Sequence, residues 1–185
     1  MSWETSIKGF KSYLQIERSL SDNSVQAYIR DVNKFANYAI PLALTELKVT
    51  RENISNFLAE IKEDNISARS QARIISGIKA FYKYLIIEDY IKYNPTELIE
   101  SPRIGLKLPD TLSLIEIDKL ITAVDLSTKQ GERNRAIIET LYSCGLRVSE
   151  LTNLQLSNIH FKEGYLKVIG KGDKERLAPI GGRAI

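Results

Sequence analysis

The chain has 185 residues, of which 43% are hydrophobic, and a net charge of +3. This length allows one or two domains with a real core, and the absence of an apolar run of about eighteen residues excludes a membrane-spanning helix. No secretion signal is visible at the start, and the single cysteine, Cys144, excludes an internal disulfide, so we expect a cytoplasmic protein in which Cys144 is a small core residue.

The first hundred residues contain four stretches in which apolar residues recur at helical spacing. The first stretch covers residues 7–14. The second follows a capping serine, Ser21, and ends before Pro41, while Thr50 and Ser67 are expected to cap the third and fourth. Four short amphipathic helices of this kind predict a compact all-α domain over residues 1–93.

The fourth predicted helix carries a polar and basic stripe opposite much of its apolar face. Arg69, Arg73 and Ser76 follow i, i+4, i+7 spacing, and Lys79 and Lys83 lie nearby. Residues 1–100 hold 13 basic and 13 acidic side chains, so charge alone does not indicate a DNA-binding domain. From the pattern alone, such a stripe is usually a solvated helix face.

Residues 94–110 are interrupted by three prolines, which predicts an extended linker. A second domain over residues 111–185 begins at a capping-box pattern, Ser113 followed by Glu116. We expect a loop over residues 128–133 and a further helix that begins at Asn134 or Arg135.

That helix leads to a turn at Gly145, a residue that suits a helix C-cap. A new apolar-periodic run starts at Leu146, which places Arg147 beside a fresh helix N-terminus, where free N–H groups and a guanidinium together favour an anion. Glu150 lies three residues on and is positioned to hold the arginine. An Arg-x-x-Glu pair taken alone is usually a surface salt bridge.

After Leu156 the periodicity becomes strand-like and predicts a three-stranded antiparallel sheet. Its second hairpin has Lys171 at the tip, between Gly170 and Gly172, without the spacing of a Walker A loop. The single histidine, His160, has no neighbour at ligand spacing, so we predict no metal site.

The chain resembles the tyrosine recombinase/integrase family, and within it the bacterial XerC/XerD branch, in two segments: Gly145-Leu146-Arg147-Val148-Ser149-Glu150-Leu151, and Gly170-Lys171-Gly172 through Lys174-Glu175-Arg176-Leu177 to Pro179. Either motif alone is weak, whereas both in this order and at this spacing are specific. The likeness extends upstream through Leu112-Ser113 and Arg135, and more loosely over the first hundred residues.

The resemblance implies a mainly α fold with a small antiparallel β-sheet. An all-helical, SAM-like core-binding domain at residues 1–93 and a linker at 94–110 would precede the first part of the α+β catalytic domain at 111–185. The implied partner is a double-stranded DNA recombination site, held in the intact enzyme by a tetramer on two DNA sites, formed with itself or with a related recombinase. The residues expected to contact DNA are Arg69, Arg73, Ser76, Lys79, Lys83, Lys174 and Arg176.

The implied activity is site-specific recombination through a 3′-phosphotyrosine intermediate, without a cofactor, as in Xer-type chromosome-dimer resolution for chromosome partition at cell division. Arg147 matches the family's first catalytic arginine, which binds the non-bridging phosphate oxygens. Lys171 matches the hairpin lysine that protonates the leaving oxygen, and Glu150 would fix Arg147.

The family pattern continues with a His-x-x-Arg pair, a further His or Trp and the nucleophilic Tyr, which nothing in this sequence matches. We therefore expect a fragment with a truncated catalytic domain that binds DNA without cutting it. Three alternatives stay open: a phage or transposon integrase, a non-catalytic DNA-binding module, and a helical protein-interaction scaffold. Salt-dependent duplex binding separates the last from the others.

Overall fold

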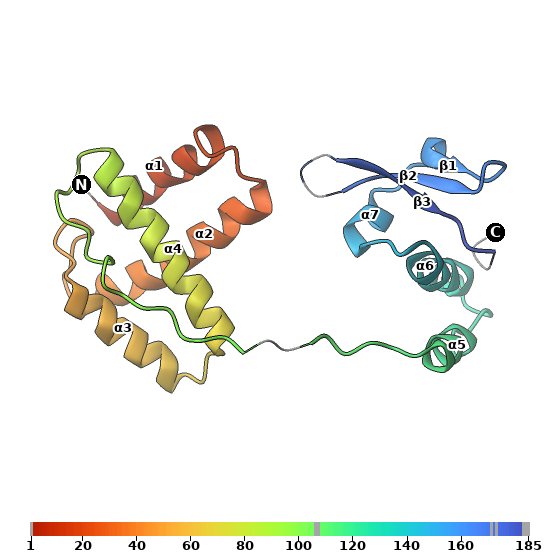
Figure 1. The fold of residues 1–185 in the computed structure, drawn as a ribbon. Helices are drawn as coiled ribbons and strands as arrows, with labels where there is room; N and C mark the ends of the chain where they lie inside the picture. Colours follow the sequence, from red (N-terminus) through yellow and green to blue (C-terminus); the bar gives the residue numbers. More distant parts are fainter. Residues whose placement is uncertain (1, 106–107, 171, 173, 183–185) are drawn as a thin grey trace. The chain divides into compact units, whose positions relative to one another are not determined.

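The computed structural model describes residues 2–105, 108–170, 172 and 174–182. The chain forms two compact units, residues 1–107 and residues 108–185 (Figure 1). Among the described residues, no helix is long and apolar enough to cross a bilayer. The expected architecture is confirmed, because the chain is mostly helical with one small antiparallel sheet.

The first unit contains the four helices that the sequence predicts: α1 (Trp3–Ile16), α2 (Asp22–Ala39), α3 (Arg51–Glu63) and α4 (Ala68–Ile87). Two predicted caps form, because the side chains of Thr50 and Ser67 accept hydrogen bonds from the backbone N–H groups of Asn53 and Ser70. Helix α4 contacts each of the other three helices, so it is the central element of this unit.

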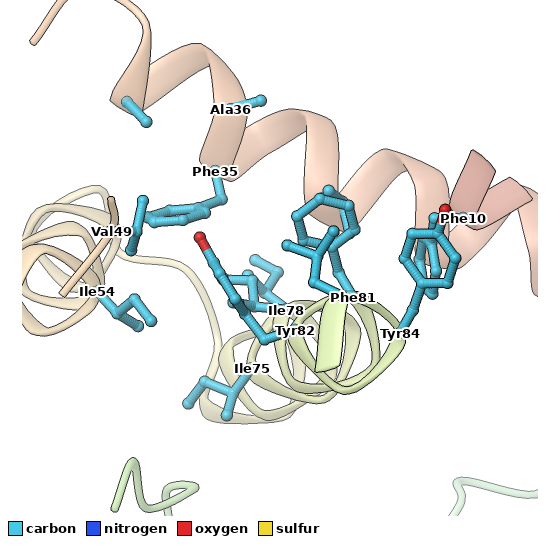
Figure 2. Packing of buried hydrophobic residues seen from close by; sticks show 14 of the residues in the cluster. Phe10, Phe35, Ala36, Val49, Ile54, Ile75, Ile78, Phe81, Tyr82 and Tyr84 are labelled. Atoms are coloured by element: carbon cyan, nitrogen blue, oxygen red, sulfur yellow. The ribbon is translucent and has the colours of Figure 1, made fainter. Parts of the chain in front are cut away.

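Aromatic residues fill the centre of the first unit. Phe10 from α1, Phe35 from α2, and Phe81 and Tyr82 from α4 are all fully buried, and Figure 2 shows how they lie between the helices. The ring of Trp3 stacks on Phe81 with 5.8 Å between centroids. Burial of this much aromatic surface is the main stabilising contribution to a small helical unit.

The segment after α4 extends the first unit beyond residue 93. Pro95 and Thr96 are buried there, and Ile99 is 7% exposed and joins the hydrophobic core. The backbone N–H and hydroxyl of Thr96 both donate to Asn94 Oδ1, which closes a tight turn. The first part of the expected linker therefore packs on the helices, because Ile99 offers an apolar anchor among the prolines.

The second unit begins with α5 (Leu114–Thr122), where Ser113 and Glu116 form the predicted capping box. It continues through α6 (Gly131–Cys144), α7 (Val148–Thr152), a 3-10 turn η1 (Leu156–Asn158), and three strands. These strands are β1 (Ile159–His160), β2 (Tyr165–Ile169) and β3 (Glu175–Pro179), antiparallel in the order β1-β2-β3.

Helix α6 begins at Gly131, three residues before the expected start at Asn134, so the predicted loop over residues 128–133 is too long. The backbone approaches closely at this point: a Cβ added to Gly131 would lie 2.3 Å from the carbonyl oxygen of Asp125. Gly131 is therefore required for the tight entry into the helix, and the sequence pattern alone treats it as a loop residue.

The second unit has a small core. Its buried cluster comprises Cys144, Leu146, Leu166, Val168 and Ala178, which come from α6, the turn after it, and one face of the sheet. On the opposite face of the sheet Ile169 and Leu177 are 54% and 63% exposed. The burial of Cys144 agrees with its predicted role as a core residue.

Candidate functional site

The turn between α6 and α7 presents Arg147. Gly145 adopts the left-handed conformation, with φ 59° and ψ 39°, and ends α6 as predicted. Leu146 is 8% exposed and anchors the turn in the core, and Arg147 follows as the N-cap of α7. Because α7 has five residues and forms a single turn, the attraction for an anion here comes mainly from the guanidinium and little from a helix dipole.

The carboxylate of Glu150 lies beneath this turn and is 1% exposed. Its Oε2 accepts a hydrogen bond from the Arg147 backbone N–H at 2.8 Å, and its Oε1 accepts one from Arg147 Nη1 at 2.9 Å. A third donor arrives from β3, where Arg176 Nη2 lies 2.8 Å from Glu150 Oε2. One buried carboxylate therefore joins two arginines.

These donors lower the pKa of Glu150 to about 2. The largest cause is the hydrogen bond from Arg176, followed by the backbone hydrogen bond from Arg147, while burial acts in the opposite direction. Glu150 is thus ionised at neutral pH. The pair differs from an ordinary surface salt bridge because its acidic partner is buried and has a second cationic partner.

The guanidinium of Arg147 remains open to solvent, with its side chain 68% exposed. Among the described residues, its side chain donates to Glu150 through Nη1, so Nε and Nη2 can still bind another ligand. The cavity beside Glu150 measures about 90 Å³, far below the roughly 300 Å³ of a typical small-molecule pocket. This geometry suits an oxyanion of a large ligand that approaches the surface.

The base of the β2–β3 hairpin packs directly against the Arg147–Glu150 pair. The Gly170 N–H donates to the Lys174 carbonyl oxygen at 2.8 Å, which extends the ladder beyond both strands. A Cβ at Gly170 would lie 3.3 Å from Glu150 Oε1 and 4.0 Å from Arg147 Nη1. The predicted catalytic Lys171 lies outside the described residues, and Lys174 is exposed.

Arg176 occupies a place that the sequence reasoning did not anticipate. In the register of the sheet it lies opposite Val168, so it shares the inner face with the buried Leu166 and Ala178. Besides Glu150, its Nη2 donates to the Gly145 carbonyl oxygen at 3.2 Å. The alternation of side chains along β3 places Arg176 on the inner face of the sheet. A charged side chain at an inward position requires a buried partner of opposite charge, so the pairing with an acidic residue could have been predicted.

The basic stripe on α4 combines exposed side chains with one side chain that forms an ion pair. Arg69 and Lys83 are exposed, Lys79 is half-buried, and the Ser76 hydroxyl donates to the Ala72 carbonyl oxygen of its own helix. Arg73 is also exposed, at 51% of its side chain, and forms an ion pair with Asp31 on α2. The stripe therefore contains one structural ion pair as well as basic side chains that form no ion pair with the described residues.

Asp31 is 3% exposed, and burial raises its pKa although Arg73 acts in the opposite direction. The two helices approach closely beside it, because a Cβ at Gly77 would lie 2.6 Å from Asp31 Cβ. A hollow of about 200 Å³ at this crossing is lined by Ser24, Ala27, Tyr28, Asp31, Arg73 and Ser76. Asp31 is a buried residue that was not predicted from the sequence, although its spacing from Tyr28 and Phe35 places it on the buried side of α2.

No metal-binding cluster of His, Cys, Asp or Glu exists among the residues that the structure describes. The ring of His160 stacks on Tyr165 with 4.5 Å between centroids, across the β1–β2 pair. His160 is thus half-buried at the edge of the sheet and contacts an aromatic neighbour.

Each of the two units matches the model of a known protein family. The model for the phage integrase N-terminal SAM-like domain matches residues 7–89, and the model for the phage integrase family matches residues 111–185. Tyrosine recombinase XerD of Staphylococcus aureus is 39% identical over 183 residues, which are 98% of this chain and 62% of that protein. XerD of Staphylococcus haemolyticus is 37% identical over 183 residues, again 98% of this chain and 62% of that protein. The chain thus spans less than two thirds of the length of these curated relatives.

Solved structures share the fold. A lambda integrase (75–356) dimer bound to a COC′ core site has a TM-score of 0.74 at 20% identity, over 97% of this chain and 62% of that one. The XerH site-specific recombinase bound to palindromic difH substrate, a post-cleavage complex, has a TM-score of 0.71 at 18% identity, over 97% and 55%. At these identities the likeness establishes the fold alone.

Proposed function

The chain belongs to the phage integrase family of tyrosine recombinases, and we propose that the protein carries out site-specific DNA recombination of the Xer type, in the cytoplasm. The observation that carries this proposal is Arg147, exposed to solvent but fixed by the buried Glu150 beside the β2–β3 hairpin. The 39% identity to XerD favours chromosome-dimer resolution over the integration of a mobile element.

In the proposed reaction a tyrosine hydroxyl attacks the scissile phosphorus, and the bond from phosphorus to the 5′ oxygen breaks. The 3′ end of the DNA stays on the enzyme as a phosphotyrosine, which the 5′ hydroxyl of a second strand later attacks to release the tyrosine. Each step exchanges one phosphodiester for another, so no ATP or other cofactor is consumed.

Arg147 would bind the non-bridging oxygens of the scissile phosphate as charge develops on them. Its open Nε and Nη2 edge can meet two oxygens at once, and the bond from Nη1 to Glu150 holds that edge in place before the substrate arrives. Lys171, outside the described residues, would protonate the leaving 5′ oxygen. Glu150 stays ionised and acts only on the orientation of Arg147.

The DNA contacts of the first unit would come from the exposed basic groups of α4, which are Arg69, Arg73 and Lys83, with Lys79 and Ser76 nearby. Lys174 would add a contact from the hairpin. Such groups bind phosphates and position the protein without reading much sequence. The recombination synapse would be a tetramer on two DNA sites, formed with this protein or with a related recombinase.

The nucleophilic tyrosine, in this proposal, is not one of the nine tyrosines of residues 1–185. Seven of the nine belong to the first unit, and Tyr13, Tyr82 and Tyr84 among them are buried in its core. The second unit contributes Tyr142 on α6 and Tyr165 in β2, which stacks on His160. Residues 1–185 alone are therefore expected to bind DNA without cutting it.

Arg147 provides the test of the proposed function. In the full-length recombinase that contains these residues, Arg147→Ala should slow strand cleavage on the order of 10²–10³-fold, because one preorganised donor to the transition state is lost. Arg147→Lys should not restore the rate, because an ammonium cannot span two oxygens. DNA affinity, measured in parallel by anisotropy, should change far less than the rate. Cleavage at the wild-type rate in Arg147→Ala would refute the proposal.

A further inference from the structure

We propose that Arg176 is a positioning residue, which sets the orientation of Arg147 through the carboxylate that the two arginines share, Glu150. This inference rests on the proposed function, in which Arg147 binds the scissile phosphate. It replaces the expectation that Arg176 contacts DNA.

The guanidinium of Arg176 is engaged by the protein itself. Its Nη2 lies 2.8 Å from Glu150 Oε2 and 3.2 Å from the Gly145 carbonyl oxygen, and its Nε lies 3.5 Å from Glu150 Oε1. The side chain is 39% exposed, compared with 68% for Arg147. Arg147 is thus more open to a ligand from outside, whereas Nε and Nη2 of Arg176 donate to acceptors of the protein itself.

The bonds of Arg176 restrain Glu150 on the side that Arg147 does not reach. Each carboxylate oxygen meets one donor of Arg147 and one of Arg176, so rotation of the carboxylate would break contacts with both residues. Without Arg176, Glu150 would be held from the turn alone. The bond to the Gly145 carbonyl also fixes the turn that precedes Arg147.

The same bonds tie the hairpin to the arginine turn. Arg176 lies on β3 two residues after Lys174, whose carbonyl accepts the N–H of Gly170 at 2.8 Å. Gly170 in turn packs against the Glu150 carboxylate. A shift of the hairpin would therefore be transmitted through Arg176 to Glu150 and so to Arg147, which couples the two parts of the site.

A lysine at position 176 would keep the charge but could not make these bonds together, because an ammonium is a point donor without the planar fork. In the full-length recombinase, Arg176→Lys should reduce the cleavage rate roughly 10²-fold, the effect of misplacing a catalytic group by about 1 Å. The affinity for DNA and its salt dependence should stay near the wild-type values, because no phosphate contact is lost.

A double-mutant cycle distinguishes positioning from a merely structural role. If Arg176 acts through Arg147, Arg176→Lys should cost little further rate in an Arg147→Lys background. A structural defect would instead multiply the two losses and so overturn the proposal. The matched control is Lys167→Gln, which removes a cation of the same hairpin and its ion pair with Glu175, 2.9 Å away across the strands. Among the described residues, the donors to Glu150 are Arg147 and Arg176, so this variant keeps their hydrogen bonds.

A second measurement does not depend on cleavage. In residues 1–185, carbon-detected NMR should show that Arg176→Lys and Arg176→Gln raise the pKa of Glu150, while the Ala178 amide signal reports that the sheet remains folded. An unchanged Glu150 titration, or cleavage at the wild-type rate by Arg176→Lys when Arg147→Ala is slowed as expected, would overturn the positioning role alone. Wild-type cleavage by Arg147→Ala would overturn the proposed function as well.

Discussion

The carboxylate of Glu150 accepts hydrogen bonds from its own turn and from Arg176, which lies 26 residues further along the chain. Sequence spacing predicts the nearer partner, because Arg147 and Glu150 are separated by one helical turn. It does not predict Arg176, because a contact between a strand and a turn depends on the register of the sheet. The contact of Gly170 with Glu150 could not be predicted for the same reason. Its position beside the hairpin tip suggests that it gives the backbone freedom, whereas in the structure a Cβ at Gly170 would lie 3.3 Å from Glu150 Oε1.

The lowered pKa of Glu150 predicts how the second unit responds to acid. The folded state takes up this proton near pH 2, whereas an unperturbed glutamate takes it up near its usual pKa of 4.5. The stabilisation is therefore fully present above about pH 5 and is lost as the pH falls from about 4.5 to about 2. In urea unfolding followed by the Ala178 NMR signal, Glu150→Gln should be less stable than wild type at pH 6, and the gap should close by about pH 2.

The exposed Glu175, which pairs with Lys167 on the outer face of the hairpin, supplies the control for that experiment. Glu175→Gln should leave the pH dependence of unfolding nearly unchanged, because an exposed ion pair contributes little to stability. A gap between wild type and Glu150→Gln that stayed constant from pH 6 to pH 2 would contradict the assigned ionisation of Glu150.

At the scale of elements, the helices of the first unit could be predicted well because their apolar periodicity and capping residues act locally. Ser21, Thr50 and Ser67 stand at the helix starts as expected, but among the described residues only the side chains of Thr50 and Ser67 accept the capping hydrogen bond from the backbone. The crossing of α2 and α4 could not be predicted, since it depends on Gly77 lying against Asp31 and on the pairing of Asp31 with Arg73. A stripe that looks like a uniform basic face thus contains one residue that also joins two helices.

This crossing makes the two arginines of α4 respond differently to substitution. Arg73→Ala removes the ion-pair partner of the buried Asp31 carboxylate and should lower the free energy of unfolding by about 1–3 kcal/mol. We expect the lower end of this range, because half of the Arg73 side chain is exposed to water.

Arg69→Ala, one turn earlier at an exposed site, should weaken duplex binding at low salt and leave stability unchanged. Fluorescence of the single tryptophan, Trp3, reports the unfolding of this unit. Equal stability of the two variants would show that the ion pair contributes nothing.

At the scale of the whole molecule, the two units differ in how completely they are packed. The core of the first unit draws on all four helices and on Ile99, whereas among the described residues the buried cluster of the second has five members. Large apolar side chains of the second unit remain exposed, including Val148 at 68% and Leu156 at 88%. An exposed apolar surface of this kind favours association with further protein. The sequence indicated the fold of each unit, but the extent of this exposure required the structure.

The proposed division of roles leads to a prediction about cleavage by residues 1–185. This polypeptide contains Arg147 and Lys171, the groups assigned to the phosphate oxygens and the leaving oxygen, but by our proposal no attacking tyrosine. Preorganised donors cannot replace an absent reactant, so we expect no covalent adduct with a nicked DNA substrate even at high protein concentration. Denaturing gel electrophoresis of labelled DNA measures this directly.

Tyr142→Phe and Tyr165→Phe are the informative controls, because these are the tyrosines of the unit that carries Arg147. A band of protein-linked DNA that disappears in either variant would place the nucleophile within residues 1–185 and would make these residues sufficient for cleavage.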